Sequence, residues 1–94
     1  MAIIVVGKLA LKPGTRAEYV LRSIVSVALA RKDVTCLDFA VSPDPIDSDR
    51  VNVYEKWKSR ADLESFRSAG SSDDLFSLVE SFDVSEYEVP EIKV

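Results

Sequence analysis

A chain of 94 residues with a net charge of −4 leaves room for one small domain, over residues 1–94, and offers no basic surface to a nucleic acid or an anionic membrane. Histidine is absent and Cys36 is the single cysteine, which excludes histidine-dependent catalytic triads, histidine-ligated haem, the common zinc sites and an intrachain disulfide. Because 47% of the residues are hydrophobic, so short a chain has apolar surface to spare, which favours self-association.

The first predicted element is a strand over Ile3–Leu11, a run of β-branched and apolar residues that ends at Lys12-Pro13-Gly14. The N-terminal run lacks the basic segment and the cleavage site of a signal peptide. No apolar stretch approaches the roughly 20 residues that span a bilayer. We therefore expect a cytoplasmic protein that does not enter a membrane.

A helix is predicted from Thr15 to about Arg31, because Thr15 and Glu18 have the spacing of a capping box. Glu18 and Arg22 form a favourable i,i+4 pair. Tyr19 lies at the edge of the predicted apolar face, where a solvated position is expected. That face consists of Ala17, Val20, Leu21, Ile24, Val27 and Ala28.

Two strands with alternating patterns follow, over Val34–Val41 and Val51–Lys58, and the short turn between them predicts a hairpin. In the first strand Leu37, Phe39 and Val41 face one side, whereas Cys36 and Asp38 face the other. In the second strand the helix-covered face carries Val51, Val53, Glu55 and Trp57. The opposite face carries Asn52, Tyr54, Lys56 and Lys58.

The last third begins with Ser59, which caps a second helix whose apolar side contains Leu63 and Phe66. A helical pattern resumes over 73–79, and Phe82–Val89 is predicted as the final strand. The order strand, helix, strand, strand, helix, strand is that of an α+β, ferredoxin-like fold with an antiparallel sheet. Helices cover one face of such a sheet, so we expect a homodimer in which a second copy covers the other face.

A family resemblance rests on the stretch 34–42, on Asp44-Pro45 and on 51–64, in which Tyr54-Glu55-Lys56-Trp57 runs into Ala61-Asp62-Leu63. In this pattern the chain resembles the antibiotic biosynthesis monooxygenase family, and the turn at 12–14 fits as well. Thr35 replaces the usual glycine, Phe66 stands where many relatives have histidine, and Val53 stands where anthrone-oxidising relatives have asparagine. Haem-degrading relatives need a histidine ligand, which this chain lacks.

The resemblance implies a dimeric α/β barrel with a substrate pocket between the sheet and the helices of each subunit. It also implies a cofactor-independent monooxygenase, which oxidises an aromatic, polyketide-like or quinol small molecule with dioxygen and uses no metal, flavin or haem. The deprotonated substrate reduces oxygen itself, so the protein supplies a dry cavity, a base and orientation. Non-catalytic binding of a small apolar molecule, or a role in assembly, remains the alternative, and an isomerase-type reaction is a third.

The candidate catalytic residues are Trp57 and Glu55. Trp57 is interpreted as a pocket wall that stacks on a flat substrate, as a core tryptophan, or as both. Glu55 is a carboxylate on an otherwise apolar face, which suits either a base with a raised pKa or a glutamate paired with an arginine or a strand-end amide. The expected substrate-binding residues are Val53, Leu63, Phe66 and Tyr19.

Overall fold

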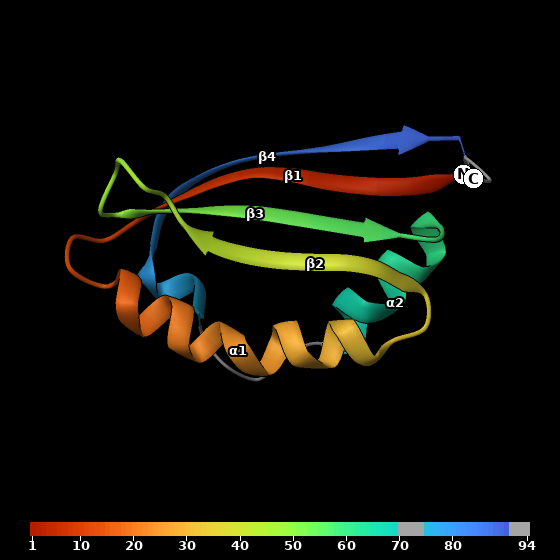
Figure 1. The fold of residues 1–94 in the computed structure, drawn as a ribbon, viewed down its shortest axis with the longest axis horizontal. Coiled ribbons are helices and arrows are strands. Elements are labelled where there is room, and N and C mark those ends of the chain that lie inside the picture. Colours follow the sequence, from red (N-terminus) through yellow and green to blue (C-terminus); the bar gives the residue numbers. More distant parts are fainter. Residues whose placement is uncertain (70–74, 91–94) are drawn as a thin grey trace.

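The computed structural model of the protein describes residues 1–69 and 75–90. Its elements are β1 (Ala2–Leu11), α1 (Arg16–Lys32), β2 (Cys36–Pro43), β3 (Arg50–Trp57), α2 (Arg60–Ala69), a short 3-10 helix η1 (Leu75–Leu78) and β4 (Val79–Val89). The strands form one antiparallel sheet in the order β2-β3-β1-β4. Both helices and η1 lie on the same side of this sheet (Figure 1). The ferredoxin-like α+β fold predicted from the sequence is therefore confirmed.

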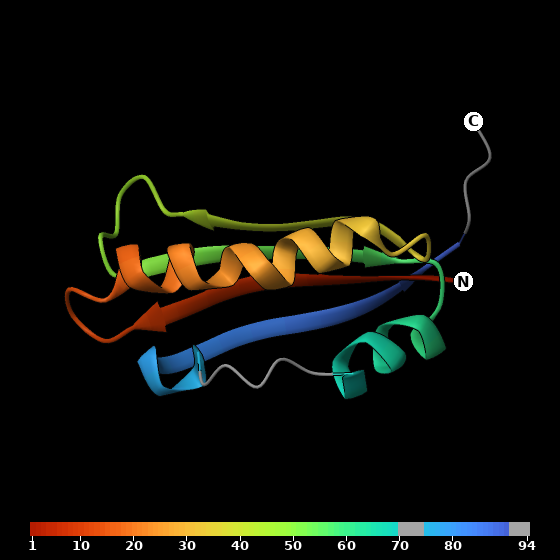
Figure 2. The same ribbon diagram turned by 90° about the horizontal axis from the view of Figure 1, so that it is seen from below.

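The helical layer has an uneven arrangement over the sheet. Figure 2 shows α1 running along the sheet, with α2 and η1 beside β4 at its two ends. No helix within the described part of the chain is long and apolar enough to cross a bilayer.

Two apolar clusters fill the space between the sheet and the helices. One surrounds Trp57, which has no exposed surface, and includes Ile3, Val5, Ala30 and Leu63. The other lies towards η1 and contains Leu9, Leu11, Tyr19 and Val51. The helix-facing positions predicted for β3 are confirmed by this packing, because Val51 and Trp57 are core residues and Val53 packs against the second cluster.

Strand β2 departs from the predicted alternation. Its register with β3 shifts between Cys36, which lies opposite Trp57, and Asp38, which lies opposite Lys56. This bulge leaves Leu37 as the extra residue, half exposed at 49%, and turns Cys36 towards the core cluster around Trp57. The prediction that Cys36 and Asp38 share a face was therefore wrong, since strict alternation fails across a bulge.

Helix α1 is rotated relative to the predicted apolar face. Its buried residues are Tyr19, Ser23 and Ala30, whereas Leu21 and Ile24 are exposed. Thr15 is the N-cap residue of α1, as predicted, but the predicted capping bond is absent, because its hydroxyl donates a hydrogen bond to the Lys12 carbonyl at 2.7 Å.

At α2 the predicted cap is present. The Ser59 hydroxyl accepts a hydrogen bond from the Asp62 backbone N–H and donates one to the Asp62 carboxylate, at 3.2 and 2.7 Å. Beyond α2, the predicted helical pattern over 73–79 becomes η1 where it is described, and residues 73 and 74 lie outside the described residues. Strand β4 begins at Val79, ahead of the predicted start at Phe82.

Candidate functional site

A cavity of about 380 Å³ lies on the helix side of the sheet. Residues of both core clusters form its walls, among them Val5 of the first and Leu9 of the second. Four polar or charged side chains interrupt this largely apolar lining. They are Tyr19, Glu55, Arg67 and Glu86.

Glu55 is the carboxylate that β3 places on the sheet wall of the cavity, opposite Val5 of β1 and Phe39 of β2. Burial raises the pKa of Glu55, while the hydrogen bond from the Trp57 indole and the charge of Arg67 partly oppose that rise. A carboxylate in these surroundings is a better proton acceptor than one in water. Arg67 acts on Glu55 only as a nearby charge, and the role of Glu55 as a base stays a prediction.

Trp57 lies two residues further along the same strand face and supports Glu55 from within the core. Its Nε1–H donates a hydrogen bond to Glu55 Oε1 at 2.9 Å. Its ring contacts Phe66 with the centroids 4.9 Å apart, and Phe66 in turn lies 6.0 Å from Phe39. Trp57 has 0% exposed surface, so it is a core residue, and it is not among the residues that line the cavity.

The remaining predicted residues divide between the cavity and the core. Val53 and Tyr19 line the cavity together with Glu55. Leu63 is fully buried and Phe66 packs beside Trp57, and neither belongs to the cavity lining. The large apolar side chains of α2 fill the core around Trp57, which is why they do not reach the cavity.

Tyr19 belongs to the inner side of α1, where its side chain is only 8% exposed. The expectation of a solvated helix edge was therefore wrong. Burial raises the pKa of the Tyr19 phenol, which stays a hydrogen-bond donor at neutral pH. The cavity thus combines one group that accepts a proton, Glu55, with one that donates a hydrogen bond.

Charged residues of α2 and β4 meet at the side of the cavity, a feature that the sequence patterns did not indicate. Glu86 accepts hydrogen bonds from Arg60 at 2.8 Å and from Arg67 at 2.9 Å. These two arginines hold the pKa of Glu86 below its ordinary value. The strand pattern contains a signal for it, because Glu86 follows Val84 by two residues and so shares its helix-facing side, where a carboxylate needs a cationic partner.

Metal-binding side chains do not gather at this site. Within residues 1–69 and 75–90, no three carboxylate or thiol side chains are grouped as a metal ion would require. The chemistry that the described site offers is proton transfer and hydrogen bonding inside an apolar cavity.

Known structures share this architecture. Rv0793 from Mycobacterium tuberculosis superimposes with a TM-score of 0.81 at 14% sequence identity, over 100% of each chain. A protein from Deinococcus radiodurans, described by its likeness to antibiotic biosynthesis monooxygenases, gives a TM-score of 0.77 at 20% identity, over 100% of this chain and 97% of that one. A conserved protein from Methanosarcina mazei gives a TM-score of 0.76 at 20% identity, over 93% of this chain and 91% of that one. At these identities the likeness shows the fold.

The sequence itself gives the family. No functionally curated protein matches it. The family model described as antibiotic biosynthesis monooxygenase matches residues 2–76, which run from the start of β1 to η1. Because that match covers well over half of the chain, the protein belongs to the antibiotic biosynthesis monooxygenase family.

Proposed function

We propose that the protein is a cofactor-independent monooxygenase that oxidises a flat phenolic or quinol-like small molecule in the cavity beside Glu55. The observation that carries this proposal is a carboxylate with a raised pKa on the wall of an otherwise apolar cavity. The cavity volume of about 380 Å³ lies within the range of about 300–1,000 Å³ found for small-molecule sites. Membership of the family supports a monooxygenase-type reaction.

In the proposed reaction, Glu55 removes a proton from an activated CH₂ group of the substrate, as in an anthrone. The resulting carbanion transfers its electrons to dioxygen, and a carbon–oxygen bond forms to give a peroxide anion, which takes the proton back from Glu55 and becomes a hydroperoxide. Loss of water then converts the CH₂ group to a carbonyl, so one oxygen atom enters the product and the other leaves as water. The substrate supplies all the electrons. Glu55 takes the second C–H proton as the oxygen–oxygen bond breaks and passes it to the departing hydroxide, which leaves as water.

Two further residues have supporting roles in this proposal. The Tyr19 hydroxyl donates a hydrogen bond to the substrate oxygen on which negative charge develops. Trp57 is a positioning residue, because its hydrogen bond fixes one oxygen of Glu55 and leaves the other for the substrate. The aliphatic wall formed by Val5, Val53 and Val84 excludes water from the reacting carbon.

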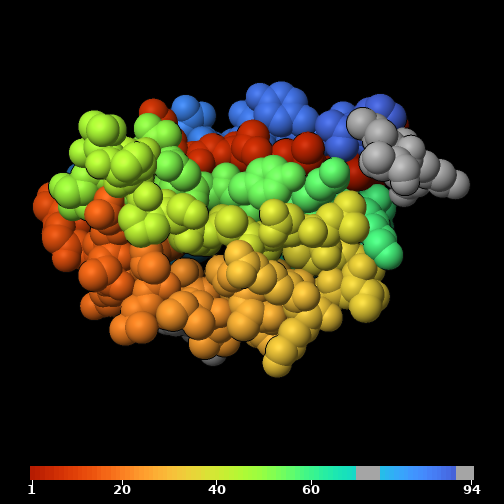
Figure 3. Space-filling model, viewed as in Figure 1, coloured from red at the N-terminus to blue at the C-terminus, as the bar shows by residue number. Residues whose placement is uncertain are grey.

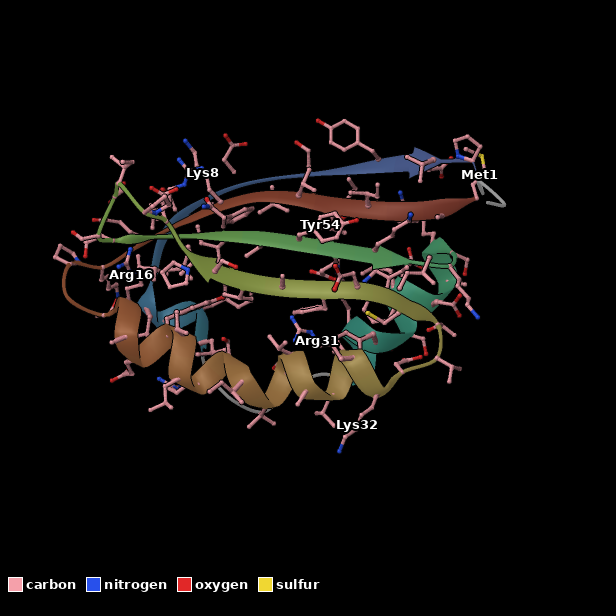
Figure 4. The ribbon with its side chains drawn as sticks, in the orientation of Figure 1. Met1, Lys8, Arg16, Arg31, Lys32 and Tyr54 are labelled. Carbon is pink, nitrogen blue, oxygen red and sulfur yellow. The ribbon has the colours of Figure 1, made fainter. Side chains whose placement is uncertain are left out.

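We also propose that the protein is a homodimer that pairs through the open face of the sheet. The register places Ile4, Val6, Tyr54 and Tyr87 on this face, away from the core residues. Tyr87 is 55% exposed, and Figure 4 shows Tyr54 lying on the sheet. A second copy would cover this mixture of aliphatic and aromatic side chains.

Oxygen uptake with a series of anthrones and polycyclic quinols tests the activity, with ligand binding followed by tryptophan fluorescence. We expect Glu55→Gln to reduce turnover by on the order of a hundredfold or more while ligand binding persists, because Gln has nearly the same shape but cannot accept the proton. Glu64→Gln, on the exposed side of α2, is the matched control and retains full activity.

The outcomes separate the candidate functions. Saturable binding without oxygen uptake would favour the non-catalytic binding domain, and unchanged turnover in Glu55→Gln would remove Glu55 as the base. Absence of any binding across the series would count against the cavity as the site.

A further inference from the structure

The outer side of α1 carries a row of uncovered aliphatic side chains. Leu21, Ile24, Val25 and Leu29 are 67%, 56%, 64% and 58% exposed. Figure 3 shows α1 bordering one whole side of the molecule, with its outer surface free of the strands. A contiguous apolar surface of this kind marks an interaction site in most soluble proteins.

The spacing of the row is that of a helix-pairing surface. Glu18, Leu21, Val25, Ala28 and Lys32 are separated by three, four, three and four residues, so they follow one line along the helix. We call these five residues the α1 stripe. It begins with Glu18, whose side chain is 56% exposed and pairs with Arg22 of the same helix at 3.2 Å. It ends with Lys32, which points away from the molecule in Figure 4.

We propose that the α1 stripe binds the same stripe of a second copy in an antiparallel arrangement. A two-fold axis at Val25 brings Glu18 against Lys32 of the partner subunit. The same axis brings Lys32 against Glu18 of the partner subunit, so the contact occurs twice. A parallel arrangement would instead place Glu18 against Glu18 and Lys32 against Lys32. Charge complementarity therefore selects both the occupant, which is this chain itself, and the direction of the pairing.

A hollow beside the stripe fits the same arrangement. It has a volume of about 410 Å³ and is lined by Ala17, Val20, Leu21 and Pro43, among others. The axis at Val25 places Leu29 of the partner subunit opposite Leu21, at the edge of this hollow. Each copy thus provides a large side chain and a space for one, as helix packing requires.

This surface lies on the opposite side of the molecule from the open sheet face. Pairing through the α1 stripe therefore does not compete with the proposed sheet-face dimer, and the two contacts together join dimers into a larger assembly. The α1 contact does not depend on the sheet-face dimer.

Sedimentation velocity over a range of concentrations tests the proposal. We expect wild-type protein to form larger species than Val25→Glu, with an average mass that rises with concentration, because that substitution opposes two carboxylates at the axis and weakens the contact on the order of tenfold or more. Ile46→Glu, at an aliphatic residue that is 92% exposed in another part of the surface, is the control and leaves the mass unchanged. Circular dichroism checks that each variant is folded.

A charge exchange tests the antiparallel direction. Lys32→Glu alone opposes Glu18 and lowers the assembly, whereas adding Glu18→Lys restores it. Equal masses for the wild type and Val25→Glu would overturn the proposed contact, and a Lys32→Glu variant that assembles as well as the wild type would overturn the antiparallel pairing. Tyr54→Glu disrupts only the sheet-face dimer, so failure of one contact is distinguished from failure of the other.

Discussion

Replacing Trp57 with Phe would isolate the hydrogen bond that supports the buried carboxylate. The substitution keeps an aromatic ring in the core and removes the Nε1–H that Glu55 accepts at 2.9 Å. Trp57 is fully buried, so loss of part of the indole costs on the order of 1 kcal/mol in packing. The hydrogen bond to a charged acceptor adds about 2 kcal/mol, which gives a total of about 3 kcal/mol in the free energy of unfolding.

The same substitution in a Glu55→Gln background separates packing from charge. The glutamine oxygen accepts the indole hydrogen bond as a neutral group, so Trp57→Phe then costs about 2 kcal/mol. The difference of about 1 kcal/mol between the two backgrounds is the part that belongs to the carboxylate. Urea unfolding at about pH 8 of the wild type, Trp57→Phe, Glu55→Gln and the double variant measures this difference.

The pH dependence of this difference provides a second check. Burial raises the pKa of Glu55 above its value in the unfolded chain, so the folded protein binds the proton more tightly. The free energy of unfolding therefore falls as the pH rises from the unfolded pKa of Glu55 through its folded pKa. Removing the indole donor raises the pKa of Glu55 further. The loss of unfolding free energy caused by Trp57→Phe therefore grows with pH. In acid, where Glu55 is neutral, this loss approaches the one measured in the Glu55→Gln background. A cost that is the same in both backgrounds at every pH would refute the proposed support of Glu55 by Trp57.

Two further predictions concern the sheet and the loop before β3. A Cβ at Gly7 would lie 2.7 Å from the Cα of Val84 on the neighbouring strand, so we expect Gly7→Ala to lower the free energy of unfolding by about 2 kcal/mol, and an unchanged urea midpoint would contradict the close approach of β1 and β4. Asp44 accepts hydrogen bonds from Ile46, Asp47 and Asn52, which lower its pKa to about 2. Its contribution to stability is complete above the unfolded value of 3.8 and is lost as the pH falls towards 2, so Asp44→Asn flattens the acid side of a plot of Tm against pH.

The sequence was most informative where one face of an element is apolar and the other is not. The alternation of β3 correctly placed Val53, Glu55 and Trp57 towards the helices, and the order of elements gave the fold. Helix α1 lacks such a contrast, because aliphatic residues surround it. Only packing against the sheet determines that Tyr19 and Ser23 turn inwards while Leu21 and Ile24 remain outside.

The candidate site was predictable only where it depends on a single strand and not on contacts between elements. Glu55 was identified because a carboxylate is unusual on an apolar strand face. The depth of Trp57, which decides whether it touches a ligand or supports Glu55, depends on how α2 folds back over the sheet and brings Phe66 against the indole ring. The meeting of Arg67 with Glu86 joins two elements whose pairing no local pattern records.

The bulge at Leu37 also bears on how this family can vary. By adding one residue to β2, it places the small thiol of Cys36 opposite Trp57 and leaves the larger Leu37 outside the paired rows. We therefore expect small residues at position 36 as long as a tryptophan occupies position 57, and more varied residues at position 37. In an alignment of relatives, we expect these two neighbouring columns to show opposite degrees of variation.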